Sequence, residues 1–344
     1  MDGKDLAPLS ASRIKNLTSC HWSYWARYHL MIPQSNNSGA LRGSICHMVF
    51  EFLLKKKHKK HYDAIIESNN IQGSEAVDRY VKSSIARDAR IYEFMLDPEH
   101  YELINEMILV GLKDDFFCKG SKLLDPEYSF NIYNEEPQYL IRGFIDKAAE
   151  YKRKKEILIK DYKSSKSKFE GEDLESNVQA MMYSLVARKV WPKLKPVVQF
   201  LFLKFPEDPI QELRYQDEQL DGFELYLNEL SKLINNFTEE DAKSNFAADQ
   251  KFPAKGEGFK GPLNCGFAKH KGQLKKDGSV MWHCPYKFDL DYYAIVDEKD
   301  NIVTTAINEK ELPELKDGQK ITTKHYDGCP KFQTKKEEDD PFDF

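Results

Sequence analysis

Two carboxylates and a lysine follow neighbouring, largely apolar segments of the chain. The run Ile157–Lys160 leads directly into Asp161, Tyr162 and Lys163, and Asp146 lies within the preceding predicted strand, 138–148. Because side chains alternate along a strand, Asp161 and Lys163 should project from one face and Tyr162 from the other. If the two runs are antiparallel neighbours, both carboxylates and the ammonium converge. Paired carboxylates suit Mg²⁺ or Mn²⁺, and a lysine can orient a water molecule and offset charge at a phosphorane-like transition state.

Three further polar residues occur at spacings that suit a shared site. Gln179 and Tyr183 are four residues apart in a segment, 177–190, that reads as a helix, so they share one helix face. His47 precedes apolar residues in another predicted helix, 40–55. Taken singly, each residue has an ordinary structural interpretation: a solvated strand end, a partly exposed glutamine, a half-buried tyrosine and a histidine at the edge of a core.

The order of predicted elements indicates an α/β fold with a helical N-terminal region. Amphipathic helices are expected over residues 76–117, with a break near Asp97 and Pro98. The pattern then changes to strands, a helix at 217–237 and a last hairpin at 288–305. The expected strands before that hairpin cover residues 128–132, 138–148, 156–162 and 197–205.

Taken together, these motifs resemble the PD-(D/E)XK nuclease superfamily, and within it the RecB-like branch. That branch includes nuclease domains of bacterial recombination helicase–nucleases and CRISPR-associated adaptation nucleases. The resemblance covers roughly residues 8–205, with a Cys-containing continuation to about 290. It rests on five motifs in the family's order: Ser10–Ser12 with Cys20, Gly43–His47, Gly143–Asp146, Asp161–Lys163 and Gln179–Tyr183. It implies a restriction-endonuclease-like core, in which a mixed sheet is flanked by helices.

The resemblance also implies roles for the site residues. Lys163 would position the attacking water, and Gln179 and Tyr183 would hold the DNA backbone or support Lys163. Glu127 matches an acidic position often found before the Gly143 motif, although an exposed glutamate at a strand start explains it equally well. A catalytic Mg²⁺ or Mn²⁺ would be bound by four residues: His47, Asp146, Asp161 and the backbone carbonyl of Tyr162.

The implied function is a metal-dependent deoxyribonuclease, a phage-type exonuclease acting on DNA ends or single strands in replication, recombination or repair. The alternative is a nuclease-fold module that binds DNA or recruits a partner without cutting. A third hypothesis is a metal-clipped nucleic-acid-binding protein built around the C-terminal Cys/His segment. The expected location is the cytoplasm of a bacterium or of a phage-infected host.

Six cysteines are spread irregularly along the chain, which favours reduced thiols or metal ligands over a disulfide framework. Some members of the RecB-like branch, which this chain resembles, bind a 4Fe–4S cluster through one cysteine before the nuclease core and three after it. Cys46 and Cys118 lie in apolar contexts and read as core thiols. The candidate cluster ligands are Cys20, Cys265, Cys284 and Cys329.

The spacing of these cysteines departs from that pattern, because eighteen residues separate Cys265 from Cys284. A histidine such as His270 or His283 could replace Cys329 as the fourth ligand. A zinc site formed by Cys265, Cys284 and these two histidines is an alternative, and the absence of any metal is a third.

Composition bounds the class of protein. The 344 residues are 41% hydrophobic and 31% charged, which is typical of a globular protein, and no apolar run approaches the roughly 18 residues of a membrane helix. The net charge is −5.

The expected organisation is a helical region at 1–125, a nuclease core at 126–240, a Cys-containing segment packing on the core at 241–330 and a disordered acidic tail at 331–344. Asp339–Phe344 ends the chain in acids and two phenylalanines, which resembles docking peptides for a sliding clamp or a single-strand DNA-binding protein.

Overall fold

The computed structural model describes residues 6–92, 98–113, 115–250 and 263–333. The chain divides into two compact units: unit 1 comprises Met1–Ile14 and Asn36–Asn236, and unit 2 comprises Lys15–Ser35 and Phe237–Phe344. In the described part of the chain, no helix has the length and apolar character needed to cross a membrane. Of the expected tail, 331–344, residues 334–344 lie outside the described part of the chain, whereas Phe332 N–H and Gln333 N–H donate to the Cys329 carbonyl oxygen.

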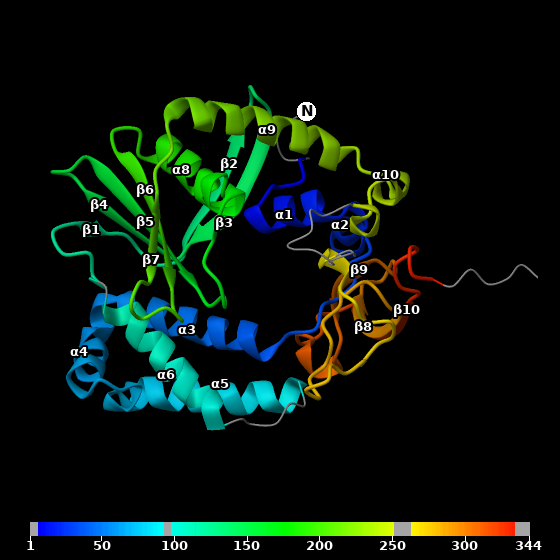
Figure 1. Cartoon of the computed structure of the whole chain (residues 1–344), viewed down its shortest axis with the longest axis horizontal. Helices are drawn as coiled ribbons and strands as arrows, with labels where there is room; N and C mark the ends of the chain where they lie inside the picture. Colours follow the sequence, from blue (N-terminus) through cyan, green and yellow to red (C-terminus); the bar gives the residue numbers. More distant parts are fainter. Residues whose placement is uncertain (1–5, 93–97, 114, 251–262, 334–344) are drawn as a thin grey trace, which may run out of the picture. The chain divides into compact units, whose positions relative to one another are not determined.

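Unit 1 is built on a five-stranded mixed sheet with the strand order β1-β4-β5-β6-β7 (Figure 1). β5 and β6 run parallel, and the other neighbouring pairs are antiparallel. The mixed sheet expected from the sequence is therefore confirmed. The strands are β1 (Lys122–Leu123), β4 (Lys147–Tyr151), β5 (Glu156–Lys163), β6 (Lys195–Phe202) and β7 (Ile210–Leu213).

A bend at Asp146 divides the segment that the sequence predicts as one strand, 138–148. β3 (Tyr139–Ile145) ends before the bend and pairs with β2 (Tyr128–Asn134) in a separate two-stranded sheet, while β4 begins directly after it. The Asp146 carboxylate accepts a hydrogen bond from the backbone N–H of Tyr162 (2.8 Å). Asp146 thus lies where the chain passes from the smaller sheet into the larger one.

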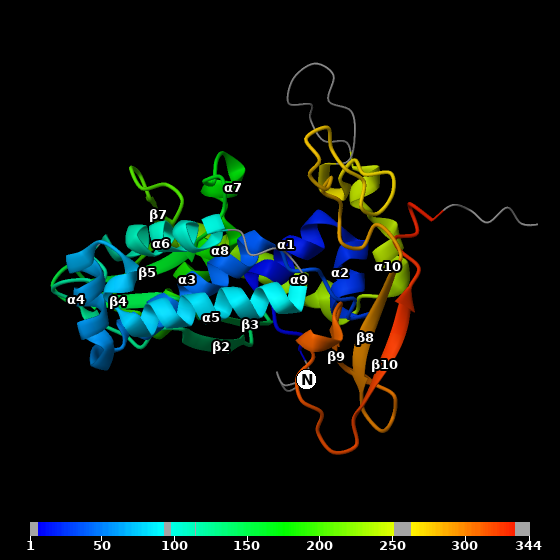
Figure 2. The ribbon, with the colours of Figure 1, turned by 90° about the horizontal axis from the view of Figure 1, so that it is seen from below.

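The helices of unit 1 form two groups, which can be followed in Figures 1 and 2. α3 (Ser38–Leu54), α4 (Lys59–Ser68), α5 (Glu75–Tyr92) and α6 (Pro98–Lys113) contact one another and enclose an apolar core. α8 (Val178–Val190) packs on β6, and α9 (Asp217–Asn235) contacts α8 and β3. Asparagine side chains cap α3 and α8 at their N-termini. α7 (Glu172–Glu175) is a short turn, and α1 (Ala11–Ser19) begins at Ser10, whose hydroxyl accepts from Arg13 N–H.

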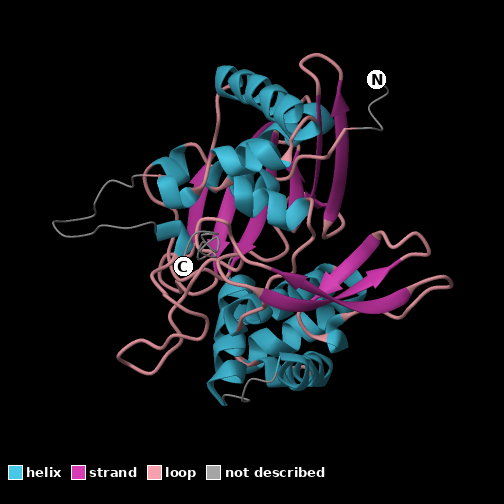
Figure 3. Ribbon diagram, turned by 90° about the vertical axis from the view of Figure 1, so that its right-hand side faces the viewer, coloured by secondary structure: helices cyan, strands magenta, loops and turns pink. Residues whose placement is uncertain are grey.

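Unit 2 joins a helical segment near the start of the chain to its C-terminal part. It contains α2 (His21–Tyr28), α10 (Glu239–Ser244) and a three-stranded sheet drawn in magenta in Figure 3, with the order β10-β8-β9. β8 (Leu290–Val296) and β9 (Ile302–Ala306) form the predicted hairpin, and β10 (Lys320–Tyr326) was not predicted. Trp22 is buried and its indole N–H donates to the Tyr326 hydroxyl (2.8 Å), so this tryptophan belongs to the core.

Candidate active site

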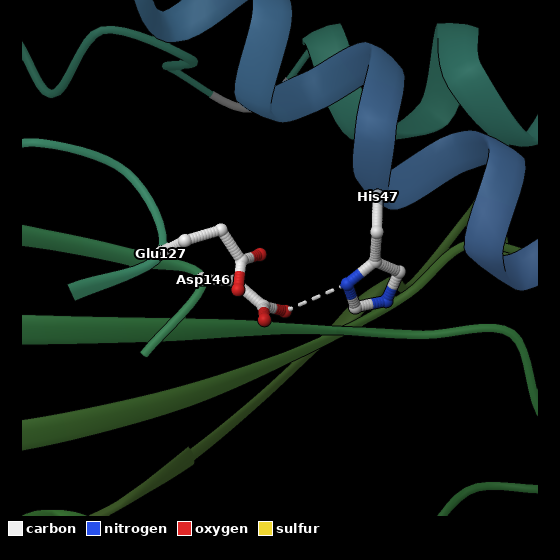
Figure 4. Close-up of side chains that lie close together, drawn as sticks. All are labelled: His47, Glu127 and Asp146. Carbon is white, nitrogen blue, oxygen red and sulfur yellow. Dashed lines mark ion pairs between the residues drawn. The ribbon is translucent and has the colours of Figure 1, made fainter. Parts of the chain in front are cut away.

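The side chains of His47, Glu127 and Asp146 come from three different elements and meet in one open cleft of unit 1 (Figure 4). His47 Nδ1 lies 3.4 Å from Asp146 Oδ2. One ligand atom from each of the three residues lies within 4.8 Å of the others. The cleft has a volume of about 520 Å³ and is also lined by Glu51 and Ser164. The expected pairing of His47 with Asp146 is therefore present in the structure.

Helix α3 presents His47 to the end of β5. Gly43, one turn before His47, allows the helix to approach closely, because a Cβ atom there would lie 2.5 Å from the Ser164 hydroxyl oxygen. The Nε2–H of His47 donates to the Tyr162 carbonyl oxygen (3.0 Å). Burial disfavours the charged imidazole, but Asp146, Asp161 and this carbonyl outweigh it and raise the pKa of His47 to about 9. Without a metal ion, the ring is therefore a cation at neutral pH.

Glu127 reaches the cleft through an unusual backbone conformation. Its φ angle of 54° lies in the left-handed region, which glutamate rarely adopts. Its N–H donates to the Asp146 carbonyl oxygen (3.2 Å), which fixes the turn before β2. Burial, and then the charge of Asp146, raises the pKa of Glu127. Glu127 is therefore half-buried in the cleft beside His47 and Asp146, and it is not an exposed glutamate at a strand start.

Asp161 and Lys163 lie on the same face of β5, as strand alternation predicts. The Lys163 ammonium is 2.7 Å from Asp161 Oδ2, and Asp161 is 3% exposed. The register of β4 and β5 pairs Lys147 with Lys160, which places Asp146 beside Asp161 at the same end of the sheet. Burial raises the pKa of Asp161, Lys163 opposes this shift, and Asp146 adds to it. Asp161 and Lys163 therefore form an ion pair at the end of the sheet where Asp146 lies, whereas the ligand atoms within 4.8 Å of one another belong to His47, Glu127 and Asp146.

Gln179 and Tyr183 hold this pair from α8. The Gln179 amide accepts from Lys163 Nζ (2.7 Å) and donates to Asp161 Oδ1 (2.7 Å) and to the Tyr183 hydroxyl (2.8 Å). That hydroxyl lies 2.9 Å from Asp161 Oδ1 and 3.0 Å from the Phe144 carbonyl oxygen. Burial, followed by the charges of Asp161 and Asp146, raises the pKa of Tyr183 and keeps its hydroxyl protonated. In this structure, Gln179 and Tyr183 support Asp161 and Lys163 directly.

The donor set of the cleft fits a hard divalent cation. Carboxylate oxygens and one imidazole nitrogen are ligands that Mg²⁺ and Mn²⁺ accept. Among the residues that the structure describes, the buried Oδ2 of Asp161 receives no hydrogen bond of good geometry, although Lys163 lies close to it. The cation beside this oxygen in the structure is the Lys163 ammonium, so the fit to a metal ion rests on the ligand atoms of His47, Glu127 and Asp146.

Four cysteines line one pocket of unit 2: Cys20, Cys265, Cys284 and Cys329. These are the four residues that the sequence nominates as cluster ligands. Burial raises the pKa of Cys265 and Cys284 to about 11 and that of Cys329 to about 12. All four thiols are free, so none is consumed in a disulfide. Thiolates are ligands of iron–sulfur clusters and of zinc, so the residue types fit either group, although no three of these sulfur atoms lie within 4.8 Å of one another in the described part of the chain.

The zinc alternative finds less support in this geometry. A tetrahedral zinc ion bound at about 2.3 Å needs its sulfur ligands within roughly 4 Å of one another. Over the described ranges, no three ligand atoms from Cys265, His270, His283 and Cys284 lie within 4.8 Å. Cys46 is fully buried and Cys118 is 2% exposed, which agrees with their interpretation as core thiols.

Two polar residues that line the cleft, Glu51 and Ser164, were not selected from the sequence. Glu51 is four residues after His47, so helical spacing was an available signal for it. Ser164 directly follows Lys163, but alternation along β5 gave no reason to select it. The basic turn 152–155 lies at the opposite end of β5 from Asp161, and Lys160 is 3% exposed, so neither lines the cleft.

Comparisons with known proteins place this site in a family. No curated protein matches the chain at a significant level. Among solved structures, one match is a protein from Eubacterium rectale named only as a candidate exonuclease. It has 14% sequence identity and a TM-score of 0.42, and the match covers 72% of this chain and 90% of that chain. Residues 8–265 match the model of the PD-(D/E)XK nuclease superfamily, and the chain therefore belongs to that superfamily.

Proposed function

We propose that the chain is a metal-dependent deoxyribonuclease of the RecB-like branch, an exonuclease that acts on DNA ends or single strands. The observation that carries this proposal is the complete set of Asp146, Asp161 and Lys163 at one end of the sheet, held by Gln179 and Tyr183. A protein that only bound DNA would have no need to keep this set together. Replication, recombination or repair are the processes that such an enzyme would serve.

A divalent metal ion in the cleft would be held by His47, Asp146 and Glu127, with Asp161 and the Tyr162 carbonyl as the further oxygen donors. When bound, such an ion lowers the pKa of a water molecule and offsets charge on a phosphoryl group. The protein's own residues do the rest. Lys163 would hold the attacking water or a phosphate oxygen with its ammonium, while Gln179 and Tyr183 fix the Asp161 carboxylate in place.

The experiment is cleavage of end-labelled linear duplex, circular duplex, single-stranded DNA and RNA with Mg²⁺ or Mn²⁺. An exonuclease degrades linear DNA and spares the closed circle. Asp161→Asn removes a charged ligand and keeps its shape, so cleavage should be lost while DNA binding persists. Asp63→Asn is the matched control, because that carboxylate pairs with Lys59 on the exposed side of α4. Cutting of wild-type rate by the Asp161 variant would refute the mechanism.

The alternative is a nuclease-fold module that binds DNA and recruits a partner without cutting. Wild-type protein that binds DNA in the same assays but leaves every substrate intact with both metals would favour it. The Asp339–Phe344 tail would then be the element that docks a sliding clamp or a single-strand DNA-binding protein.

We also propose that Cys20, Cys265, Cys284 and Cys329 bind a 4Fe–4S cluster. Their common pocket is the support for this proposal. Protein purified without oxygen should be brown, with iron and sulfide in equal amounts, and Cys20→Ser should lose both colour and stability. Cys118→Ser is the control, because that buried thiol does not line the pocket. Colourless wild-type protein without metal, fully folded, would leave the four thiols as unmetallated pocket residues.

A further inference from the structure

The eighteen residues between Cys265 and Cys284 leave the cysteine pocket and return to it as a closed loop, which we call the hairpin loop (residues 266–283). The two cysteines are joined directly by a hydrogen bond from Cys284 N–H to the Cys265 carbonyl oxygen (3.1 Å). Gly266 and His283 form the next bridge. Further out, Met281 N–H donates to the Gln273 carbonyl oxygen (2.7 Å), and Lys275 N–H donates to the Ser279 carbonyl oxygen (2.7 Å).

The base of the hairpin loop is fixed by a buried lysine. Lys287 Nζ donates to the carbonyl oxygens of Gly266 (3.0 Å) and Ala268 (2.7 Å), and Ala268 is fully buried. Gly266 has φ +69°, and a Cβ atom there would lie 2.4 Å from the Trp282 carbonyl oxygen. The two chain segments at the base of the hairpin loop are therefore packed as closely as a glycine permits. The outer part of the loop projects from this fixed base.

The hairpin loop exposes large apolar side chains that a folded chain would ordinarily bury. Trp282 is 58% exposed and Phe267 is 48% exposed, and both are adjacent to the bridge at the base. Leu274 and Val280, which form a bridge further out, are also exposed. By contrast, Trp22 in the same unit is 6% exposed and hydrogen-bonded. Exposed aromatic side chains gathered on one short segment mark an interaction site.

The same loop is strongly basic. It carries four exposed lysines against one aspartate, Asp277, whose carboxylate accepts from Ser279 N–H and Oγ–H. Within the described residues, no ion pair engages these lysines. The lysines are Lys269, Lys271, Lys275 and Lys276.

We propose that the hairpin loop binds single-stranded nucleic acid, with Trp282 and Phe267 stacking on bases and the four lysines contacting phosphates. Proteins that bind single strands commonly stack aromatic side chains on the unpaired bases and place positively charged side chains near the phosphates. The positive charge complements a phosphate backbone and argues against an apolar protein partner. The choice of nucleic acid also rests on the proposed nuclease function, which makes such a strand the substrate.

The test measures binding separately from cleavage, in Ca²⁺ or EDTA, with the full chain. The probes are fluorescent oligothymidylate and oligouridylate of about 20 nucleotides and a duplex of the same length. Trp282→Ala should weaken binding to single strands by about tenfold, and Trp282→Phe should restore most of the loss. Tyr226→Ala, at a partly exposed tyrosine of α9, is the matched aromatic control and should bind as wild type.

Two further readouts identify the contacts. Single strands should quench the tryptophan fluorescence of wild-type protein, and Trp282→Ala should lose that quenching. The double variant Lys275→Gln, Lys276→Gln should reduce the slope of log affinity against log salt by about 1.4, since each phosphate contact on a single strand contributes about 0.7. The adjacent exposed pair Lys56 and Lys57, changed in the same way, should leave the slope unchanged.

The outcomes separate this inference from the proposed function. If the protein cuts DNA but the hairpin variants bind every strand as tightly as wild type, the inference is wrong and the nuclease stands. If no substrate is cut but Trp282 is needed for binding, the nuclease is wrong and the inference stands. Binding of anionic vesicles or an acidic peptide through the hairpin loop, with no binding of either oligonucleotide, would overturn the inference that the loop binds single-stranded nucleic acid. Thermal unfolding midpoints equal to wild type establish that each variant is folded.

Discussion

Gln179→Glu gives a sensitive test of the network around Asp161. The amide nitrogen that donates to Asp161 Oδ1 at 2.7 Å would be replaced by a carboxylate oxygen. At that separation, two unit charges repel by roughly 6 kcal/mol for an effective dielectric constant near 20. That energy corresponds to about 4.5 pKa units. Lys163, which lies 2.7 Å from the Gln179 amide oxygen, offsets much of the repulsion, but burial, the largest cause of the raised pKa of Asp161, also disfavours a second carboxylate there. The folded variant should therefore keep one shared proton on the two carboxyl groups at pH 7.

The sign of the stability effect follows from proton counting. In the unfolded chain the introduced carboxyl group has a pKa near 4.3, so it releases its proton above about pH 5. The folded state retains the proton, and its pKa is therefore raised relative to the unfolded state. The free energy of unfolding of Gln179→Glu should then fall with rising pH, by up to about 1.4 kcal/mol per pH unit between about pH 5 and pH 7.

Gln179→Met is the matched control, because it removes the same hydrogen bonds and adds no titratable group. Urea unfolding of both variants, in EDTA and at several pH values, gives the difference between their free energies of unfolding. Because His47 and Asp146 are present in both variants, their titration cancels in this difference. We expect that difference to grow steadily with pH. A difference that stays constant over this range would show that the amide of Gln179 does not face a charged Asp161, and the network described above would be wrong.

Three further predictions concern other parts of the chain. The pKa of His47 is raised to about 9, so its ring must lose a proton to bind a metal ion. The Mn²⁺ affinity measured by calorimetry should therefore rise by up to about tenfold per pH unit between about pH 7 and pH 9. An affinity that does not change with pH would show that His47 is not a ligand. Gly43→Val should force α3 away from Ser164 and cost about 1–3 kcal/mol in denaturant unfolding, and a neutral result would contradict the close approach. Deletion of Asp339–Phe344 should leave cleavage of naked DNA unchanged and weaken cleavage of DNA loaded with a sliding clamp or single-strand-binding protein. Equal activity on loaded DNA would assign the tail no docking role.

The parts of the site that depend on local periodicity were predictable. Alternation along one strand places Asp161 and Lys163 together, and a spacing of four on a helix places Gln179 beside Tyr183. These relations hold whatever surrounds the element. The chain order of the motifs then indicated the PD-(D/E)XK superfamily, which the match over residues 8–265 confirms, whereas the RecB-like branch stays a prediction.

Features set by tertiary contacts were not predictable in the same way. The strand predicted through Asp146 is bent there, because its carboxylate bonds to the backbone of β5. The contribution of Glu127 depends on a left-handed backbone angle that favours glycine or asparagine and carries no signal at a glutamate. The long gap between Cys265 and Cys284 argued against a shared site, but the hydrogen bond between these cysteines closes the gap. The domain boundaries at 125, 240 and 330 stay a prediction.

The composition of unit 2 has a consequence for the order in which the protein is made. Its first part, Lys15–Ser35, leaves the ribosome before the whole of Asn36–Asn236, whereas its second part follows that segment. Trp22 must wait for Phe246 and Tyr326, which are more than 200 residues away along the chain. Unit 1 can close as soon as β7 and α9 have emerged, since its elements contact one another. Until residues 237–246 have emerged, the apolar face of α2 lacks its contacts with α10, and a nascent chain in that state offers a surface to chaperones.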